Sequence, residues 1–209
     1  MEFDLQKYAI NLAIYICYYI RISKKYLREK FIEKLNEIFK YRNFLDLPLL
    51  EMKFITDNAD IPKDIAKNQT LSECIFSIFC AINTRIPLFI FGKSGLGKSL
   101  SAQIIYKSMK GKSSKNDFFK KFPKLVVFSY QGSLSSSSKE VEAIFNKANN
   151  AEEIFRLKNK DNIALVFFDE IGLAEKSANN PLKDIHSHLE IDSNREKKIK
   201  GRIYWNIKL

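Results

Sequence analysis

Three short apolar runs mark the middle of the chain. They are IPLFIFG from residue 86, KLVVFSY from residue 124 and NIALVFFDE from residue 162. None of them alternates between apolar and polar positions, and a strand buried on both faces has no reason to alternate. Each run therefore predicts a strand of a parallel sheet that is covered on both faces, and Pro87 is tolerated because it opens its strand.

Helical patterns precede and separate these strands. Residues 71–84 form a long apolar segment, residues 98–111 alternate as a helix does and stop at Gly111, and residues 135–159 begin with serines that can cap a helix. The order strand, helix, strand, helix, strand is typical of a parallel sheet covered on both faces. The expected fold class is therefore α/β.

The region before the first strand has a different pattern. Residues 5–39 carry apolar positions at mixed three- and four-residue steps, which predicts one long helix or two shorter ones. Residues 45–70 contain two prolines and scattered Asp and Asn, a composition that predicts a linker leading into a new domain.

Composition favours a folded protein with a strong positive charge. The 209 residues are 45% hydrophobic, and 35 Lys and Arg against 24 Asp and Glu give a net charge of +11. Such a charge suits nucleic acid, an anionic membrane surface or a phosphorylated ligand. Because Ile, Asn, Lys and Phe are abundant throughout, the charge indicates a general bias, and we do not expect nucleic acid as a partner.

The cysteines and the most apolar segment exclude other classes of protein. Cys17, Cys74 and Cys80 lie in apolar runs without CxxC spacing, which predicts buried thiols in a reducing, cytoplasmic compartment. Residues 8–20 are fewer than the ~20 that a bilayer span needs, and the residues before them lack the basic character of a secretory signal. We expect a buried or partner-docked helix there, and no membrane span.

The segment GKSGLGKS, residues 92–99, matches the phosphate-loop pattern G-x-x-x-x-G-K-[ST] in full, between a predicted strand and a predicted helix. Gly92 and Gly97 are expected to permit backbone torsions and a close approach that a Cβ would block, so that N–H groups face phosphate oxygens. Lys98 would neutralise the β- and γ-phosphates, beside the positive end of its helix, and the Ser99 hydroxyl would coordinate magnesium.

ATP and Mg²⁺ are thus the expected cofactors. The expected contacts to the nucleotide are Gly92, Lys93, Ser94, Gly95, Leu96, Gly97, Lys98, Ser99 and Leu100.

The third apolar run ends in two carboxylates, Asp169 and Glu170. The carboxyl ends of parallel strands share one edge of a sheet with the phosphate loop, so these side chains are expected near the nucleotide. Asp169 would hold the metal together with Ser99, directly or through water, and Glu170 would orient or deprotonate the attacking water. Lys98 and Glu170 are therefore the expected catalytic residues.

The phosphate loop together with FFDE resembles a P-loop ATPase of the AAA+ type, in which a Glu follows the metal-binding Asp. Two longer stretches, from IPKDIAKNQT at residue 61 to KSLSA and from DEIGLAE at residue 169 to HSHLE, are similar to the AAA+ modules of mysterin, the giant RING-finger AAA+ ubiquitin ligase family. This resemblance implies tandem modules, one or two of which hydrolyse ATP. Its implied partners are neighbouring modules and the ubiquitin machinery.

The same resemblance assigns parts of the chain. It puts residues 61–66 against the adenine and makes Asn206, in YWN, the candidate for the polar sensor residue. No lid and no RING-type Cys/His array follow, so the core is expected to be incomplete. The expected domains are a helical segment at 1–44, the AAA+ core at 45–192, and a basic tail or remnant of the sensor strand at 193–209.

Other polar residues are read as structural. His186 and His188 stand two residues apart on an expected helix, where they face different sides and cannot share a metal. Arg85 is expected to be structural, and REKKIKGR at 195–202 to be a solvated tail.

Three functions remain open from the sequence. The first is an ATP-binding and ATP-hydrolysing fragment of a mysterin-like ligase. The others are a structural nucleotide-binding module without turnover and a nucleic-acid-stimulated P-loop ATPase. We expect the isolated chain to bind ATP with little or no turnover, and the protein from which it derives to be an ATPase.

Overall fold

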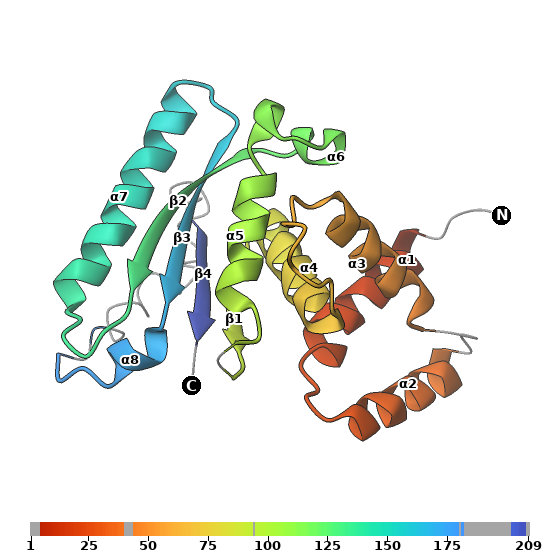
Figure 1. Ribbon diagram of the computed structural model, residues 1–209. Coiled ribbons are helices and arrows are strands. Elements are labelled where there is room, and N and C mark those ends of the chain that lie inside the picture. The colour runs from red at the N-terminus through yellow and green to blue at the C-terminus, as the bar shows by residue number, and fades with distance from the viewer. Residues whose placement is uncertain (1–4, 40–43, 94, 180, 182–201, 208–209) are drawn as a thin grey trace. The chain divides into compact units, whose positions relative to one another are not determined.

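The structure is a computed structural model (Figure 1), and it describes residues 5–39, 44–93, 95–179, 181 and 202–207. The chain divides into two compact units, Met1–Asp57 and Asn58–Leu209. The division follows Asp57, whereas the sequence pattern places it after residue 44.

The first unit is helical. Helix α1, Leu5–Ile14, continues as a π-helical turn, η1, at Tyr15–Tyr19, and helix α2 spans Lys25–Phe39. Residues 5–39 therefore form two helical segments, the second of the two predicted alternatives. Helix α3, Asp46–Asn58, occupies much of the predicted linker, so that prediction is wrong. Pro48 does not prevent this helix because it lies in the first turn, where a backbone N–H has no helical partner.

One face of the α1–η1 segment packs against α3. Tyr15 and Tyr19 are buried and stack with ring centroids 5.1 Å apart. The Tyr15 hydroxyl contacts Met52 Sδ at 3.7 Å, and the Tyr8 hydroxyl donates to the Glu51 carboxylate. These contacts hold the apolar segment to α3 along one side.

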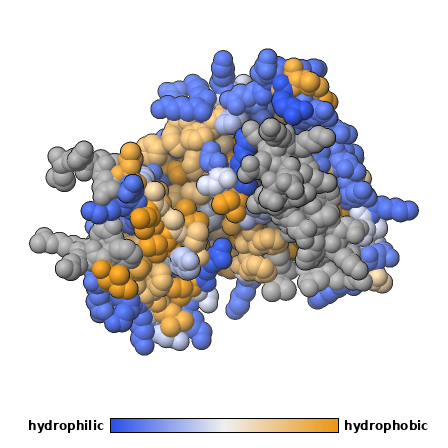
Figure 2. Space-filling view, turned by 180° about the vertical axis from the view of Figure 1, so that it is seen from behind, coloured by the Kyte–Doolittle hydropathy of each residue, from blue (hydrophilic) through white to orange (hydrophobic). Residues whose placement is uncertain are grey.

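Apolar residues of this unit also reach the surface. Leu5, Ile10 and Tyr18 are exposed. Figure 2 shows apolar side chains, in orange, gathered on the left side of the view. Cys17 is exposed too, so the prediction of a buried thiol is wrong there, and Cys74 and Cys80 in the second unit are half-buried, not fully buried as predicted. None of the described helices combines the length and the apolar character that a bilayer crossing requires.

The second unit contains a parallel sheet and its helices. Its strands are β1 Leu88–Phe91, β2 Lys124–Gln131, β3 Asn162–Asp169 and β4 Arg202–Ile207. Its helical elements are α4 Gln69–Thr84, α5 Lys98–Ser108, η2 Gly111–Ser113, α6 Asp117–Lys120, α7 Ser138–Leu157 and α8 Ile171–Glu175. The first three strands and helices α4, α5 and α7 confirm the predicted strand-helix alternation. The sequence pattern did not predict η2, α6 or α8.

All strand pairs in the sheet are parallel, in the order β1-β4-β3-β2. Gln131 pairs with Asp169, and Phe168 pairs with Trp205. Strand β4 therefore lies between the strand that leads into the phosphate loop and the strand that ends in the acidic pair. The predicted parallel α/β sheet is confirmed, and residues 202–207 are a regular strand of it.

Helix α7 begins where its sequence predicts. The Ser137 side chain accepts a hydrogen bond from the Glu140 N–H, and the Glu140 carboxylate accepts one from the Ser137 N–H at 3.0 Å, which is a complete capping box. Further along the helix, the Glu152 carboxylate accepts the Ala164 N–H of β3 at 2.8 Å. Helix α7 is thus fixed at its first turn and tied to the sheet beside it.

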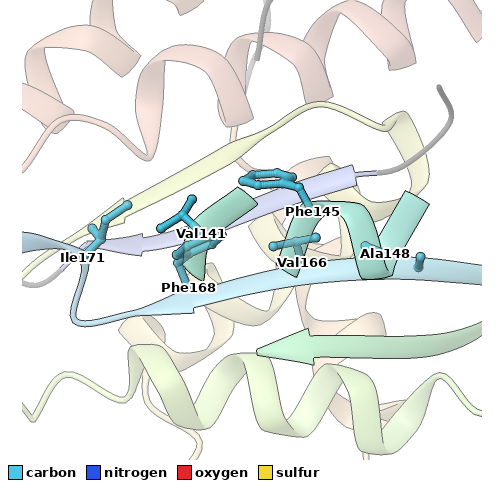
Figure 3. Close-up of a cluster of buried hydrophobic side chains, with 7 residues drawn as sticks. Val141, Phe145, Ala148, Val166, Phe168 and Ile171 are labelled. Carbon is cyan, nitrogen blue, oxygen red and sulfur yellow. The ribbon is translucent and has the colours of Figure 1, made fainter. Parts of the chain in front are cut away.

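The core under α7 is made from alternate residues of β3. Figure 3 shows Val166 and Phe168 of β3 beside Val141 and Phe145 of α7. Phe145 and Phe168 have ring centroids 5.8 Å apart, and both side chains are almost fully buried. On the other face of β3, Phe167 meets Tyr106 of α5 with ring centroids 6.3 Å apart. Helices therefore cover both faces of this strand.

We predict that Phe145→Ala destabilises the protein by about 3–5 kcal/mol, because it opens a cavity beneath α7. Leu157→Ala on the same helix is the matched control, since Leu157 is 74% exposed, and its effect should stay within about 0.5 kcal/mol. Urea unfolding followed by circular dichroism measures both changes. Equal effects of the two substitutions would contradict the described packing.

Candidate nucleotide-binding site

The phosphate loop joins β1 to α5. Strand β1 ends at Phe91 and α5 begins at Lys98, so the pattern lies between a strand and a helix as predicted. Gly95 and Gly97 have φ angles of +83° and +75°, a left-handed conformation that side chains rarely adopt. Ser94 is outside the described residues. The tight turn thus depends on Gly95 and Gly97, because their left-handed backbone conformation is costly for residues that have a Cβ.

Gly92 is required for space and not for its torsion angles. Its φ is outside the left-handed region, and a Cβ at this position would lie 3.1 Å from Leu96 Cδ1 and 4.0 Å from Lys98 Nζ. The torsional role predicted for Gly92 belongs to Gly95 instead, while the role predicted for Gly97 agrees with its geometry. A larger residue at 92 would press on the side chain of Lys98.

Lys98 is held inside the loop. Its side chain is largely buried, and Nζ donates to the carbonyl oxygens of Gly92 at 2.6 Å and Lys93 at 2.7 Å. An ammonium group has three N–H donors, so these two bonds occupy two of them and, among the described residues, leave the third without a partner. Ser99 and Leu100 follow in the first turn of α5 and are half-buried.

Helix α4 closes the back of the loop. A Cβ on Gly97 would lie 3.4 Å from Leu71 Cδ1, so the first turn of α4 packs on this glycine. Burial raises the pKa of the nearby Cys74 thiol, and the Glu73 carboxylate adds to this rise, whereas the Ser101 hydroxyl and the Lys98 ammonium oppose it. Leu71 and Cys74 were not predicted as neighbours of the loop, because contacts between two helices leave no local pattern.

Asp169 lies on the face of the sheet that α5 covers. Side chains alternate along β3, and Phe167 already contacts Tyr106 of α5, so Asp169 two residues later points to the same face. Burial raises the pKa of the Tyr106 hydroxyl, and the negative charge of Asp169 raises it further. The Asp169 carboxylate therefore lies on the face of the sheet that is covered by α5, the helix that begins at the phosphate loop.

Glu170 adopts an unusual backbone conformation. Its φ of +55° and ψ of +36° are left-handed, and it directly precedes α8. The Asp169 carboxylate accepts the Glu170 N–H at 3.0 Å. A left-handed conformation costs a residue with a Cβ about 1–2 kcal/mol, and such strain clusters at functional sites.

Gly132 holds this turn from the neighbouring strand. Its N–H donates to the Asp169 carbonyl at 2.8 Å, one residue beyond the end of β2. A Cβ on Gly132 would lie 2.4 Å from the Glu170 carbonyl oxygen and 3.3 Å from Ala174 Cβ. Gly132 was missed by the sequence pattern, because its tight contact joins residues 38 positions apart. Because Gly132 has no side chain, the turn formed by Asp169 and Glu170 can pack directly against its backbone.

The donors present fit a magnesium ion that also binds a nucleotide. Among the described residues, no group of three or more His, Cys, Asp or Glu is placed to hold a metal by itself. Mg²⁺ in phosphate-transfer sites is held by one or two protein oxygens together with substrate phosphates and water. Asp169 and the Ser99 hydroxyl would supply such oxygens, from β3 and from the first turn of α5.

The other predicted residues stand as follows. Asn206 pairs with Ile90 in the sheet, so its backbone lies near the carboxyl end of the strand between β1 and β3. Residues 61–66 precede α4, and Arg85 ends α4 in a left-handed conformation. His186 and His188 are outside the described residues.

The sheet order and the phosphate loop define a P-loop protein of the AAA class. A family model described as the RNF213 AAA domain matches residues 64–205. The chain therefore belongs to the RNF213 AAA domain family, and the predicted resemblance to the giant AAA+ ubiquitin ligases is confirmed.

Curated relatives agree with this assignment. The chain is 35% identical over 182 residues to E3 ubiquitin-protein ligase rnf213-beta of Danio rerio, which is 86% of this chain and 4% of that protein. It is 31% identical over 191 residues to E3 ubiquitin-protein ligase RNF213 of Homo sapiens, 90% of this chain and 4% of the relative. The Mus musculus protein of the same name is 28% identical over the same length. The chain thus spans about 4% of the length of these relatives.

We predict that Gly132→Ala destabilises the protein by about 1–3 kcal/mol, because the added methyl group must displace the Glu170 carbonyl. Ser135→Ala in the same connection is the control: Ser135 is exposed, and its replacement should change stability by at most about 0.5 kcal/mol. Denaturant unfolding of both variants measures the difference. A neutral Gly132→Ala would mean that the turn does not need this close approach.

Proposed function

We propose that this chain binds Mg-ATP through residues 92–100 and that Asp169 and Glu170 serve its hydrolysis. The observation that carries the proposal is the Lys98 ammonium, which is buried within the loop and fixed by two carbonyl oxygens. A buried cation with one remaining donor, at the start of a helix, favours a phosphate group as its partner.

The proposed division of labour follows the positions of the side chains. Backbone N–H groups of the loop would contact the phosphates, Lys98 would neutralise the β- and γ-phosphates, and Ser99 with Asp169 would hold Mg²⁺. The ion, when bound, supplies positive charge to the phosphate oxygens. Glu170 would orient or deprotonate the attacking water, beside the Asp169 carboxylate that accepts its N–H.

Two further assignments rest on the family resemblance. Asn206 is proposed as the polar sensor, supported by the position of β4 between the strands of the phosphate loop and the acidic pair. Residues 61–66 are proposed to contact the adenine, supported by their place directly before the helix whose Leu71 packs on Gly97.

Turnover is proposed to depend on a larger protein. Proteins of the AAA+ type, which this site resembles, also use an arginine finger from a neighbouring module. The isolated chain would therefore bind ATP and hydrolyse it slowly or hardly at all. In a longer cytoplasmic ligase like its relatives, nucleotide turnover would drive conformational change among neighbouring modules. The ubiquitin-ligase activity would then reside in other parts of that protein.

We predict that Lys98→Ala weakens Mg-ATP binding roughly 10- to 100-fold, because a buried charge-assisted contact to phosphate is lost. Isothermal titration calorimetry measures the affinity. Lys107→Ala, an exposed lysine at the other end of α5, is the matched control and should bind as the wild type does. Equal affinities of wild type and Lys98→Ala, or no binding by folded wild type, would refute ATP binding at this loop.

We predict that Glu170→Gln slows single-turnover phosphate release at least tenfold, with ATP affinity retained, because removing a water-orienting carboxylate affects the chemical step alone. The measurement uses enzyme in excess over radiolabelled ATP, so that slow turnover is detected. Identical release by the two proteins would instead support a structural nucleotide-binding module without turnover.

A further inference from the structure

Positive charge is concentrated in the connection between α5 and β2. Residues 107–124 include seven lysines and one acidic residue, Asp117, whereas the whole chain of 209 residues has 35 Lys and Arg. All seven lysines are exposed. This density exceeds the general composition of the chain, so the sequence-based view that the charge is an even bias does not extend to this segment.

Only part of this charge is neutralised. Lys115 pairs with Asp60 at 2.8 Å, and Lys120 pairs with Asp117 at 2.7 Å. Within the described ranges, none of the other five lysines forms an ion pair. Lys107 belongs to the last turn of α5, and the remaining four are called the lysine patch: Lys110, Lys112, Lys121 and Lys124. They come from η2, α6 and the start of β2 and their flanks, elements that contact one another.

Two members of the lysine patch are held directly opposite each other. Lys110 and Lys124 form an antiparallel bridge, which the Leu125 N–H extends by donating to the Met109 carbonyl at 3.0 Å. Like charges directly opposite in such a pair are destabilising. Gly111 has a φ of +61° and lies against Lys124, so the backbone keeps the two lysines together. A local conflict of this kind is expected where a sequence serves binding more than stability.

The lysine patch is separate from the nucleotide site. Lys124 opens β2 and Lys110 follows the end of α5, so both lie at the amino edge of the sheet, whereas the phosphate loop is at the carboxyl edge. Helix α5 alone puts about 15 Å between Lys98 and Ser108, at 1.5 Å per residue. ATP binding therefore does not account for these lysines.

Half-buried aromatic rings stand among the lysines. The ring centroids of Phe118 and Phe122 are 5.0 Å apart, and the ring of Phe79 of α4 packs against that of Phe122 with centroids also 5.0 Å apart. Residues 107–124, all of them described, include no exposed large hydrophobic side chain that would enter a bilayer. Partly exposed rings beside lysines are suited to stacking with bases, while lysines contact a phosphate backbone without reading its sequence.

From these observations we propose that the lysine patch binds single-stranded nucleic acid through its phosphodiester backbone, with Phe118 and Phe122 as stacking surfaces. Binding is independent of base sequence and of ATP. It weakens steeply with salt, because each phosphate contact releases a counterion.

Fluorescence anisotropy with a labelled oligothymidylate at low salt tests the proposal on the full chain. Lys110→Glu should weaken binding roughly tenfold and also raise the Tm, because it replaces a repulsive cross-strand pair with an attractive one. Lys147→Glu, an exposed lysine on α7, is the matched control of equal charge change and should alter binding about twofold or less. If Lys110→Glu fails to fold, Lys112→Glu with Lys121→Glu should give the same loss of binding.

Four outcomes of these experiments would overturn the proposal. Absence of binding at low salt excludes a nucleic-acid partner, and an equal loss in Lys147→Glu reduces the effect to net charge. Displacement of the oligonucleotide by Mg-ATP would assign the binding to the phosphate loop. Binding to phosphatidylserine vesicles without binding to the oligonucleotide would identify a lipid surface as the partner.

Discussion

Strand β3 is buried on both faces and paired on both edges, and the geometry of the site follows from that constraint. Its alternate side chains meet α7 on one face and α5 on the other. Because β2 and β4 run parallel to it, all three strands end at one edge, where β3 terminates in Asp169. The face that meets α5 also receives Asp169, so one strand register places a carboxylate beside the helix of the phosphate loop.

The turn after this strand is more strained than the strand itself. Glu170 has a left-handed conformation, which costs a residue with a Cβ about 1–2 kcal/mol. Its carbonyl fits only against a glycine, and Gly132 also donates a hydrogen bond to the residue before it. The end of β2 and the acidic turn therefore act as one unit: the direction of the Glu170 backbone is determined by a neighbouring strand as much as by its own sequence.

Local patterns predicted what depends on local physics. Continuous apolar runs predicted β1, β2 and β3, and the fixed spacing from Gly92 to Ser99 predicted the loop between strand and helix. Helix α3 was missed because prolines normally indicate a break, although Pro48 lies in the one turn that tolerates it. Gly132 and Leu71 were missed because their roles arise from contacts between distant segments. The torsional role of Gly95 was also missed, because the sequence motif does not reveal which of its glycines has a positive φ.

Parallel pairing also separates the two regions where anions are proposed to bind. In a parallel sheet every strand begins at one edge and ends at the other, so the start of β2 with Lys124 and the end of β3 with Asp169 lie on opposite sides of the unit. A nucleotide and a phosphodiester chain would therefore not compete for the same lysines. Helix α5 begins at Lys98 and ends two residues before Lys110. Any influence of one ligand on the other would have to pass along this helix or through β2, whose far end holds the acidic turn through Gly132.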